Sequence, residues 1–463
     1  MIIEQIYTNC LAHAAYYIES NGMVAIIDPL RDVDVYIQKA KANGATIKYI
    51  FETHFHADFV SGHIDLANKT GASIIFGPKA EPNYNAFIAE DGEVFTLGDI
   101  RIKAIHTPGH TIESTCYLIY DEQGNEHSIF TGDTLFVGDV GRPDLMSGNL
   151  NKEELAALLY DSLNEKIKTL PDNVIVYPGH GAGSACGKNI GKETSSSISE
   201  QKKYNYALEA SNKDEFIKVV TADLPIPPPY FFKDAAINKN GYQSFDKVIK
   251  NNLKPLSIKN FIEEIKNGAH ILDTRDALTF GSGFINGAIN IALNGDFAVW
   301  VGTLIEFNNP IVIVTAEGQE KETITRLARI GFENVKGYLK GGMLAWIVDK
   351  QWTDNIPFCD AIQSLSLLKT GKYVLLDVRK KSEVEHEKIK DSVHISLNEL
   401  RSKLPLLDKN EKWLVYCAGG YRSMIAASLM KAYGISNVSN IHGGINLVKK
   451  ATPEIIEIGT SLN

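Results

Sequence analysis

Short apolar stretches separated by polar turns fill the first 180 residues of the chain. The stretches are rich in β-branched and aromatic residues, which is the pattern of strands buried in a sheet. They cover 23–28, 47–53, 73–77, 100–105, 114–120, 128–132 and 174–179. Helical patterns occur at about 61–70 and 151–168, and Gly71 stands just past the first as a C-cap. Runs of strands with helices outside them predict two sheets covered by helices.

The pattern turns helical and polar from about 196 to 220, and a proline-rich segment follows at 224–232. Its sequence is LPIPPPYFF, and stacked prolines favour an extended conformation. We interpret this segment as the end of the first domain or a stiff bridge. A proline-rich ligand for another protein is the alternative interpretation.

The rest of the chain contains an internal repeat. AHILDTRD at 269–276 recurs as YVLLDVRK at 373–380, and PIVIVTAEG at 310–318 recurs as KWLVYCAGG at 412–420. A third motif, which ends in Gly-Gly, recurs at nearly the same spacing of about 100 residues. Each copy alternates strand and helix, so each is expected to be a small α/β domain with a mainly parallel sheet. The expected domains are 1–250, 255–355 and 360–463.

Composition and charge narrow the class of protein. Hydrophobic residues make up 44% and charged residues 22%, which is ordinary for a globular chain. The net charge of −9 disfavours nucleic acid and anionic membranes as partners. Membrane-length apolar runs and a secretory signal are not visible. The five scattered cysteines argue against a disulfide framework and favour a reducing, cytoplasmic setting. We expect a homo-oligomer.

Histidine and aspartate gather where the predicted strands of the first domain end. Eight of the 12 histidines lie in the first 180 residues. His54, His56 and Asp58 follow one strand, and residues two apart on an extended chain point the same way. The other members of the set are His106, His110, Asp133 and His180. Four such motifs at four strand ends predict a metal centre, whereas one lone histidine would indicate a structural residue.

These residues resemble the metallo-β-lactamase superfamily over roughly 1–245, which implies an αββα sandwich. The superfamily signature HxHxDH reads HFHADF at 54–59. Phenylalanine therefore stands where binuclear members supply a ligand to a second metal. Phe59 cannot coordinate, so we predict a single metal; a substitute ligand from His63 is the alternative.

Two further stretches, 138–145 and 177–188, resemble persulfide dioxygenases that are fused to rhodanese domains. The resemblance implies one Fe(II) per chain, held by His54, His110 and Asp133. Two histidines and one carboxylate leave open positions for dioxygen and substrate.

Other polar residues of the first domain have supporting roles by the same resemblance. The residues implied to orient the ligands are His56, Asp58 and His180. Those implied to bind the thiol carrier are Arg142, Asp144 and Tyr177. A purely structural Arg142–Asp144 pair is the alternative, and Cys186 is either near the mouth of the site or a buried structural thiol.

The second copy of the repeat carries a candidate sulfur-transfer loop. Cys417 follows a strand and is succeeded by Ala418, Gly419, Gly420, Tyr421 and Arg422 before a helix. Strand, glycine-rich loop and helix form a cradle of N–H groups for an anion. With LLDVR upstream and HGG downstream, the CxxGxR loop resembles a rhodanese domain. The resemblance implies Cys417 as the nucleophile, Arg422 as its partner and the residues between them as the persulfide loop.

The first copy departs from this pattern. Thr315 replaces the cysteine and Glu320 replaces the arginine. A carboxylate in the cradle opposes anion binding, so the first copy resembles an inactive rhodanese.

The resemblance implies an enzyme of sulfide detoxification. It would oxidise a low-molecular-weight thiol persulfide with O2 to sulfite, and Cys417 would transfer sulfane sulfur to make thiosulfate. One alternative is a zinc thioester hydrolase of the glyoxalase II kind fused to a rhodanese. The other is a sulfane-sulfur carrier that oxidises nothing.

Overall fold

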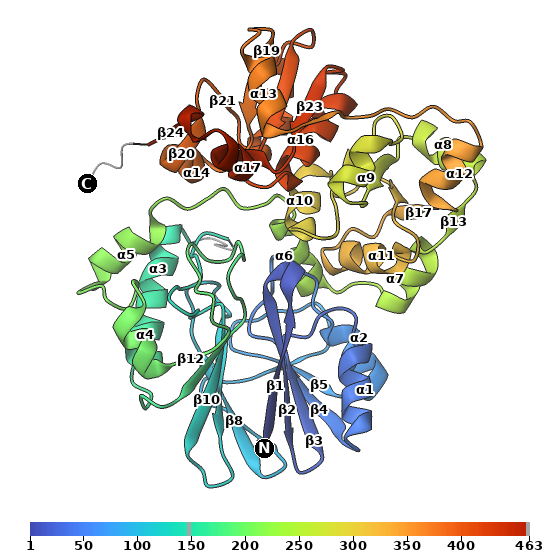
Figure 1. The fold of residues 1–463 in the computed structure, drawn as a ribbon. Helices are drawn as coiled ribbons and strands as arrows, with labels where there is room; N and C mark the ends of the chain where they lie inside the picture. Colours follow the sequence, from blue (N-terminus) through green and yellow to red (C-terminus); the bar gives the residue numbers. More distant parts are fainter. Residues whose placement is uncertain (146–149, 460–463) are drawn as a thin grey trace. The chain divides into compact units, whose positions relative to one another are not determined.

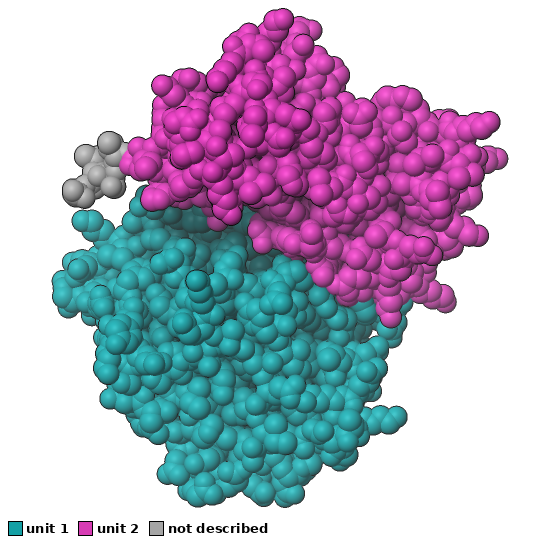
Figure 2. Space-filling model, in the orientation of Figure 1, with its two compact units in different colours: residues 1–248, 327–331 teal, residues 249–326, 332–463 magenta. Residues whose placement is uncertain are grey.

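The computed structural model describes residues 1–145 and 150–459, and it contains two compact units (Figure 2). The first unit comprises Met1–Val248 and Leu327–Gly331, and the second comprises Ile249–Arg326 and Phe332–Asn463. Within the described residues, each helix is too short or too polar to span a membrane.

The first unit contains two six-stranded sheets that face each other (Figure 1). The first sheet runs in the order β1 (Ile2–Thr8), β2 (His13–Ser20), β3 (Met23–Ile27), β4 (Thr46–Phe51), β5 (Ser73–Phe76) and β6 (Phe87–Ile88). The second runs in the order β12 (Ser196–Ser197), β11 (Ile175–Pro178), β10 (Glu126–Gly132), β9 (Thr115–Tyr120), β8 (Ile100–His106) and β7 (Val94–Leu97). Tyr16, Ile27, Ile102, Tyr117 and Phe130 belong to the buried core between the sheets.

Helices cover the outer face of each sheet. The first sheet carries α1 (Asp34–Ala42) and α2 (His63–Thr70). The second carries α3 (Lys152–Asp161), the π-helical turn η2 (Ser162–Ile167), α4 (Ile198–Tyr204) and α5 (Lys213–Thr221). Asn151 caps α3 in a capping box with Glu154, and Gly71 ends α2 with a φ of 76°, as its position predicted. These layers confirm the predicted αββα sandwich.

The remaining elements of this part of the chain are short. They are η1 (Asn9–Leu11), α6 (Phe231–Asn240) and α7 (Phe245–Asn252). All seven predicted strands are present, but the prediction missed β1, β2 and α1. β1 reads IIEQIYT and β2 begins HAA, so neither shows the long apolar run or the clean alternation that marks a strand.

The second unit contains the two copies of the repeat, each a five-stranded parallel sheet with the same strand order. The first copy is ordered β13 (Pro255–Leu256), β17 (Val335–Leu339), β16 (Ile311–Val314), β14 (His270–Asp273) and β15 (Ile289–Asn290). The second is ordered β18 (Phe358–Cys359), β23 (Val438–Ile441), β22 (Lys412–Tyr416), β19 (Tyr373–Asp377) and β21 (Val393–His394). The identical order confirms two tandem rhodanese-like α/β folds.

Helices connect these strands. In the first copy they are α8 (Ile258–Lys266), α9 (Ala277–Ser282), α10 (Phe297–Leu304), α11 (Glu320–Arg329) and α12 (Gly342–Val348). In the second they are α13 (Ala361–Leu368), α14 (Lys381–His386), α15 (Leu397–Lys403), η3 (Leu404–Leu406), α16 (Tyr421–Ala432), α17 (Gly444–Ala451) and η4 (Pro453–Ile455). A two-stranded sheet pairs β20 (Glu387–Ile389) with β24 (Ile456–Ile458).

Candidate functional site

The three residues predicted to hold iron meet in the first unit. His54, His110 and Asp133 are buried, and their ligand atoms all lie within 4.8 Å of one another. Oδ2 of Asp133 is 4.0 Å from Nε2 of His54 and 3.5 Å from Nε2 of His110. The side chains come from the ends of β4, β8 and β10, on two different sheets. The sandwich therefore builds the triad at one end of its strands.

Backbone carbonyls fix the orientation of two imidazoles. Nδ1 of His110 lies 2.9 Å from the carbonyl oxygen of Arg142, and Nδ1 of His180 lies 3.2 Å from that of Ala12. A carbonyl only accepts, so each Nδ1 donates its proton and each Nε2 keeps its lone pair. Both Nε2 atoms face Asp133 and are ready to bind a cation.

Burial sets the charge of the first ligand. The pKa of His54 is held well below its usual value by burial, and next by the neighbouring imidazoles of His56 and His110. His54 is therefore neutral near pH 7, which is the state that binds a metal.

A second set of potential ligands lies beside the first. His56, Asp58 and His180 are buried and also offer ligand atoms within 4.8 Å of one another. His180 Nε2 is 3.5 Å from Oδ2 of Asp58 and 3.6 Å from Oδ1 of Asp133. The Asp133 carboxylate thus lies between the two sets. Phe59 packs on the His56 ring at 4.4 Å between ring centres, where the superfamily signature has a histidine.

The donor atoms of this centre fit a metal ion. Among the described residues, both oxygens of Asp133 and Nε2 of His180 are buried without a hydrogen-bond partner. Such atoms cost roughly 1–3 kcal/mol each unless something binds them. Imidazole and carboxylate groups are ligands that zinc and iron both accept.

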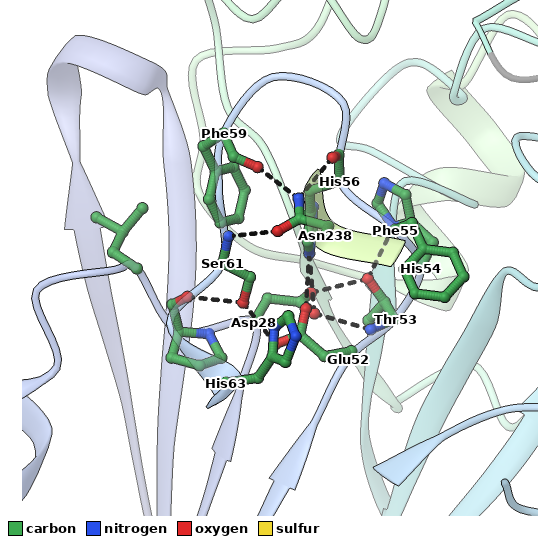
Figure 3. A network of polar contacts seen from close by, with 12 residues as sticks. Asp28, Glu52, Thr53, His54, Phe55, His56, Phe59, Ser61, His63 and Asn238 are labelled. Atoms are coloured by element: carbon green, nitrogen blue, oxygen red, sulfur yellow. Dashed lines mark hydrogen bonds and ion pairs between the residues drawn. The ribbon is translucent and has the colours of Figure 1, made fainter. Parts of the chain in front are cut away.

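A buried polar network supports the ligand loop (Figure 3). Asp28 accepts hydrogen bonds from the N–H and the hydroxyl of Thr53, both at 2.8 Å, and lies 3.1 Å from Nε2 of His56. Glu52 accepts a 2.6 Å hydrogen bond from Ser61. Burial, followed by the charge of Asp28, raises the pKa of Glu52 well above its usual value. These groups hold His56 from the side opposite the metal ligands of the triad.

Asn238 ties the same loop together from α6 (Figure 3). Its amide N–H groups donate to the carbonyl oxygens of His56 at 2.8 Å and Phe59 at 2.7 Å. Its Oδ1 accepts the N–H of Ser61 at 2.9 Å. Sequence reasoning missed Asn238, because a single asparagine on a polar helix carries no motif.

Two more buried side chains reach this centre. Cys186 offers its sulfur within 4.8 Å of ligand atoms of Asp133 and His180, and burial raises its pKa to about 12, with Asp58 contributing next. The thiol is therefore protonated and buried rather than at an open mouth.

His13 is the second of these side chains. It is fully buried, its ring packs on Phe59 at 4.2 Å, and neither ring nitrogen has a partner among the residues that the structure describes. The sequence gave no signal for His13, which stands alone at the start of β2.

The three residues predicted to bind the thiol carrier have partners of their own. Arg142 is buried and bonds Asp144 through two nitrogens, at 2.7 and 2.8 Å. The same guanidinium donates to the carbonyl oxygens of Ala185 and Pro225, so the proline-rich segment packs against it. Tyr177 is half-buried and stacks on Phe130 in the sheet. Their role in binding a carrier stays a prediction.

In the second copy, the loop after β22 wraps its cysteine as the rhodanese resemblance implies. Cys417 is 1% exposed, and its Sγ accepts hydrogen bonds from the N–H of Gly420 at 3.1 Å and the hydroxyl of Ser423 at 3.4 Å. Gly420 has a φ of 107°, a conformation that glycine adopts without strain. The loop therefore stabilises a negative sulfur with donors.

Arg422 is paired with a carboxylate that the sequence did not reveal. Its guanidinium donates to both oxygens of Glu383, at 2.6 and 2.8 Å. Burial opposes this charge, but Arg422 outweighs it and lowers the pKa of Glu383. In the first copy, the corresponding loop begins at Thr315, and Glu320 starts α11.

Comparison with known proteins identifies the class. The metallo-beta-lactamase superfamily matches residues 8–180, and the rhodanese-like domain matches 257–349 and 361–451. The solved metallo-beta-lactamase from Staphylococcus aureus subsp. aureus COL is 31% identical, covers 73% of this chain and 98% of its own, and has a TM-score of 0.65. The chain belongs to the metallo-beta-lactamase superfamily, and two rhodanese-like domains follow its sandwich.

Two further relatives match smaller parts. ETHE1 from Myxococcus xanthus is 30% identical, over 52% of this chain and 98% of its own, with a TM-score of 0.45. A probable hydroxyacylglutathione hydrolase of Schizosaccharomyces pombe is 34% identical over 166 residues, which is 35% of this chain. The chain spans 60% of the length of that curated relative.

Proposed function

We propose that the first unit is an Fe(II)-dependent persulfide dioxygenase. The observation that carries the proposal is the buried convergence of His54, His110 and Asp133, two imidazoles and one carboxylate. Iron bound by such a triad would supply adjacent open positions for dioxygen and a persulfide sulfur. One thiol persulfide, one dioxygen and one water would give one thiol, one hydrogen sulfite and one proton. Dioxygen is reduced, and the outer sulfur is oxidised.

The chain's own residues would prepare this site. His54 and His110 present neutral Nε2 atoms, because burial and the Arg142 carbonyl fix their state and orientation. Phe59 and the buried surroundings exclude bulk water from the reacting sulfur. The small-molecule partners that this reaction requires are the thiol persulfide, dioxygen and sulfite.

The second rhodanese-like copy would use the sulfite. Cys417 attacks the outer sulfur of a persulfide and becomes a cysteine persulfide. Hydrogen sulfite then attacks that outer sulfur, thiosulfate and a proton leave, and the Cys417 thiol is restored. The donors from Gly420 and Ser423 stabilise the negative sulfur at each stage.

Thioester hydrolysis is a second candidate function. It is favoured by the set of His56, Asp58 and His180, which could hold a second metal beside the triad. It is also favoured by the 34% identity to a probable hydroxyacylglutathione hydrolase. Phe59 weighs against it, because the sixth signature position supplies no ligand.

Metal analysis and oxygen uptake distinguish the two functions. Protein purified without oxygen is expected to hold about one iron per chain and to consume O2 with glutathione persulfide. Asp133→Ala should lose metal and oxygen uptake together, whereas Asp161→Ala, a surface carboxylate on α3, should lose neither. Two zinc ions per chain with hydrolysis of a hydroxyacylglutathione would overturn the proposal. A protein that does neither reaction but loads Cys417 with sulfur would be a carrier.

A further inference from the structure

A cavity of about 620 Å³ opens over the Cys417 loop, within the second unit. Its size falls in the ~300–1,000 Å³ range of pockets that hold small organic molecules. The second copy lines it with the loop, Lys380 and Glu383. The inactive first copy lines it with Gly295, Asp296 and Trp300, among others. The copy without a nucleophile is therefore part of the pocket of the copy that has one.

Close packing fixes this wall. The Tyr421 hydroxyl donates to the carbonyl oxygen of Ala292 at 2.9 Å, and the N–H of Asn290 donates to the Ser428 hydroxyl at 3.0 Å. A Cβ on Gly295 would lie 2.5 Å from the Tyr421 ring, so only glycine lets the segment approach. The wall is held against the loop residue that stands four positions after the nucleophile.

The charges that face the cavity are arranged as a pair of opposite, separate groups. Arg422 and Glu383 neutralise each other in a two-bond ion pair. The Asp296 carboxylate is exposed and makes no hydrogen bond or ion pair with the part of the chain that the structure describes. The exposed Lys380 ammonium likewise forms no ion pair there. One unpaired anion from the first copy and one unpaired cation from the second remain available to a ligand.

We propose that this pocket takes the persulfide of a zwitterionic, amino-acid-type thiol, with the ligand's ammonium at Asp296 and a carboxylate at Lys380. The proposal rests on the proposed sulfur transfer at Cys417. In that step the bond from Cys417 Sγ to the outer sulfur forms and the bond between the two sulfurs of the donor breaks. The released thiolate takes the proton that Cys417 gives up. A small inorganic anion is too short to touch Asp296 while it reacts at the loop.

The test removes the ammonium from either side of the contact. Glutathione persulfide and its N-acetylated form differ in one charge, and transfer to Cys417 is followed by intact mass in single turnovers. Oxygen is absent, so the proposed oxidation at the first unit consumes no donor. The full-length chain is expected to react about fivefold faster, at subsaturating donor, with the free-amine form, since an exposed ion pair is worth up to about 1 kcal/mol. Asp296→Asn should bring the ratio of the two rates to about one.

Asp349→Asn is the matched control, because Asp349 is an exposed carboxylate of the first copy outside the cavity lining. It should keep the fivefold preference, and thermal unfolding checks that both variants are folded. A wild-type ratio of one, a ratio unchanged by Asp296→Asn, or a ratio lost in both variants overturns the inference and leaves Cys417 transfer standing. If neither donor loads Cys417, the proposed sulfur transfer itself is wrong.

Discussion

In the first rhodanese-like copy the guanidinium of Arg275 forks onto the Asp273 carboxylate, with contacts of 2.5–3.1 Å. In the second copy Arg379 forks onto Asp377 in the same way, at 2.6–3.0 Å. Both pairs are buried at the end of the central strand, β14 or β19. Only the loop after the neighbouring strand differs in its chemistry. The comparison indicates that the Asp–Arg pair belongs to the fold, whereas sulfur transfer belongs to the loop.

The loops differ at the two positions that matter most. Cys417 is replaced by Thr315, and Arg422 by Glu320. The partner of Arg422 differs as well, since Glu383 corresponds to Thr279 at the same distance after the conserved strand. The first copy has therefore lost the nucleophile, the cation and the anion that holds the cation.

The largest effect is expected from Cys417→Ser. A serine hydroxyl is not ionised near pH 7 and carries no sulfane sulfur, so thiosulfate formation should fall to the level of a no-enzyme control. Oxygen uptake with persulfide should persist, because the metal ligands lie in the other unit. The sulfite-to-thiosulfate ratio at early times measures the shift. Cys359→Ser, in the same copy but outside the loop, is the control. Loss of oxygen uptake at normal iron content would place Cys417 in the oxidation.

Asp273→Asn and Asp377→Asn are expected to have the next largest effect. Each leaves a buried arginine without its counter-charge, which costs about 3 kcal/mol of unfolding free energy. Equal costs in denaturant unfolding would show that the pair serves the fold in both copies. A much larger loss of sulfur transfer than of stability for Asp377→Asn would contradict this separation.

A smaller effect concerns the Glu383–Arg422 pair and depends on pH. Arg422 lowers the pKa of folded Glu383, so the pair stabilises the fold above the unfolded glutamate pKa of about 4.3. This contribution is lost as pH falls through the lower folded pKa. The pair is partly exposed, with side chains 17% and 32% accessible, so Glu383→Gln should cost about 0.5–1 kcal/mol at pH 7. Denaturant unfolding of both proteins at pH 7 and in acid should show the difference shrink.

The smallest effect is expected from restoring only the nucleophile to the first copy. Thr315→Cys in a Cys417→Ser background should give no thiosulfate:cyanide sulfurtransferase activity, because Glu320 still repels an anionic sulfur. Adding Glu320→Arg tests the same point from the other side. Robust activity of Thr315→Cys, Cys417→Ser would refute the electrostatic explanation.

Local pattern predicted much of the molecule. Apolar runs located seven strands of the first unit, and the residues that follow them were expected to converge because strand ends meet at one edge. The convergence of His54, His110 and Asp133 agrees with that expectation. The repeat likewise predicted two α/β folds, since the same motifs recur at nearly constant spacing.

Contacts between distant segments could not be predicted. Asn238 bonds His56 across 182 positions, and Tyr421 bonds Ala292 across 129. A hydrogen bond of this kind leaves no periodicity and no motif in either segment. Asp296 gave no signal for the same reason, because it acquires a role only when the first copy packs against the second copy's loop.

The amide of Asn238 bears on where the chain can be divided. A fragment that stops at residue 180, where the superfamily match ends, would keep every candidate metal ligand and lose α6. The carbonyl oxygens of His56 and Phe59 would lose their donors, and the N–H of Ser61 its acceptor. Arg142 would also lose its contact with Pro225. The smallest piece that keeps the metal centre intact therefore extends past Asn240, so the catalytic module is about 60 residues longer than the region that sequence similarity marks.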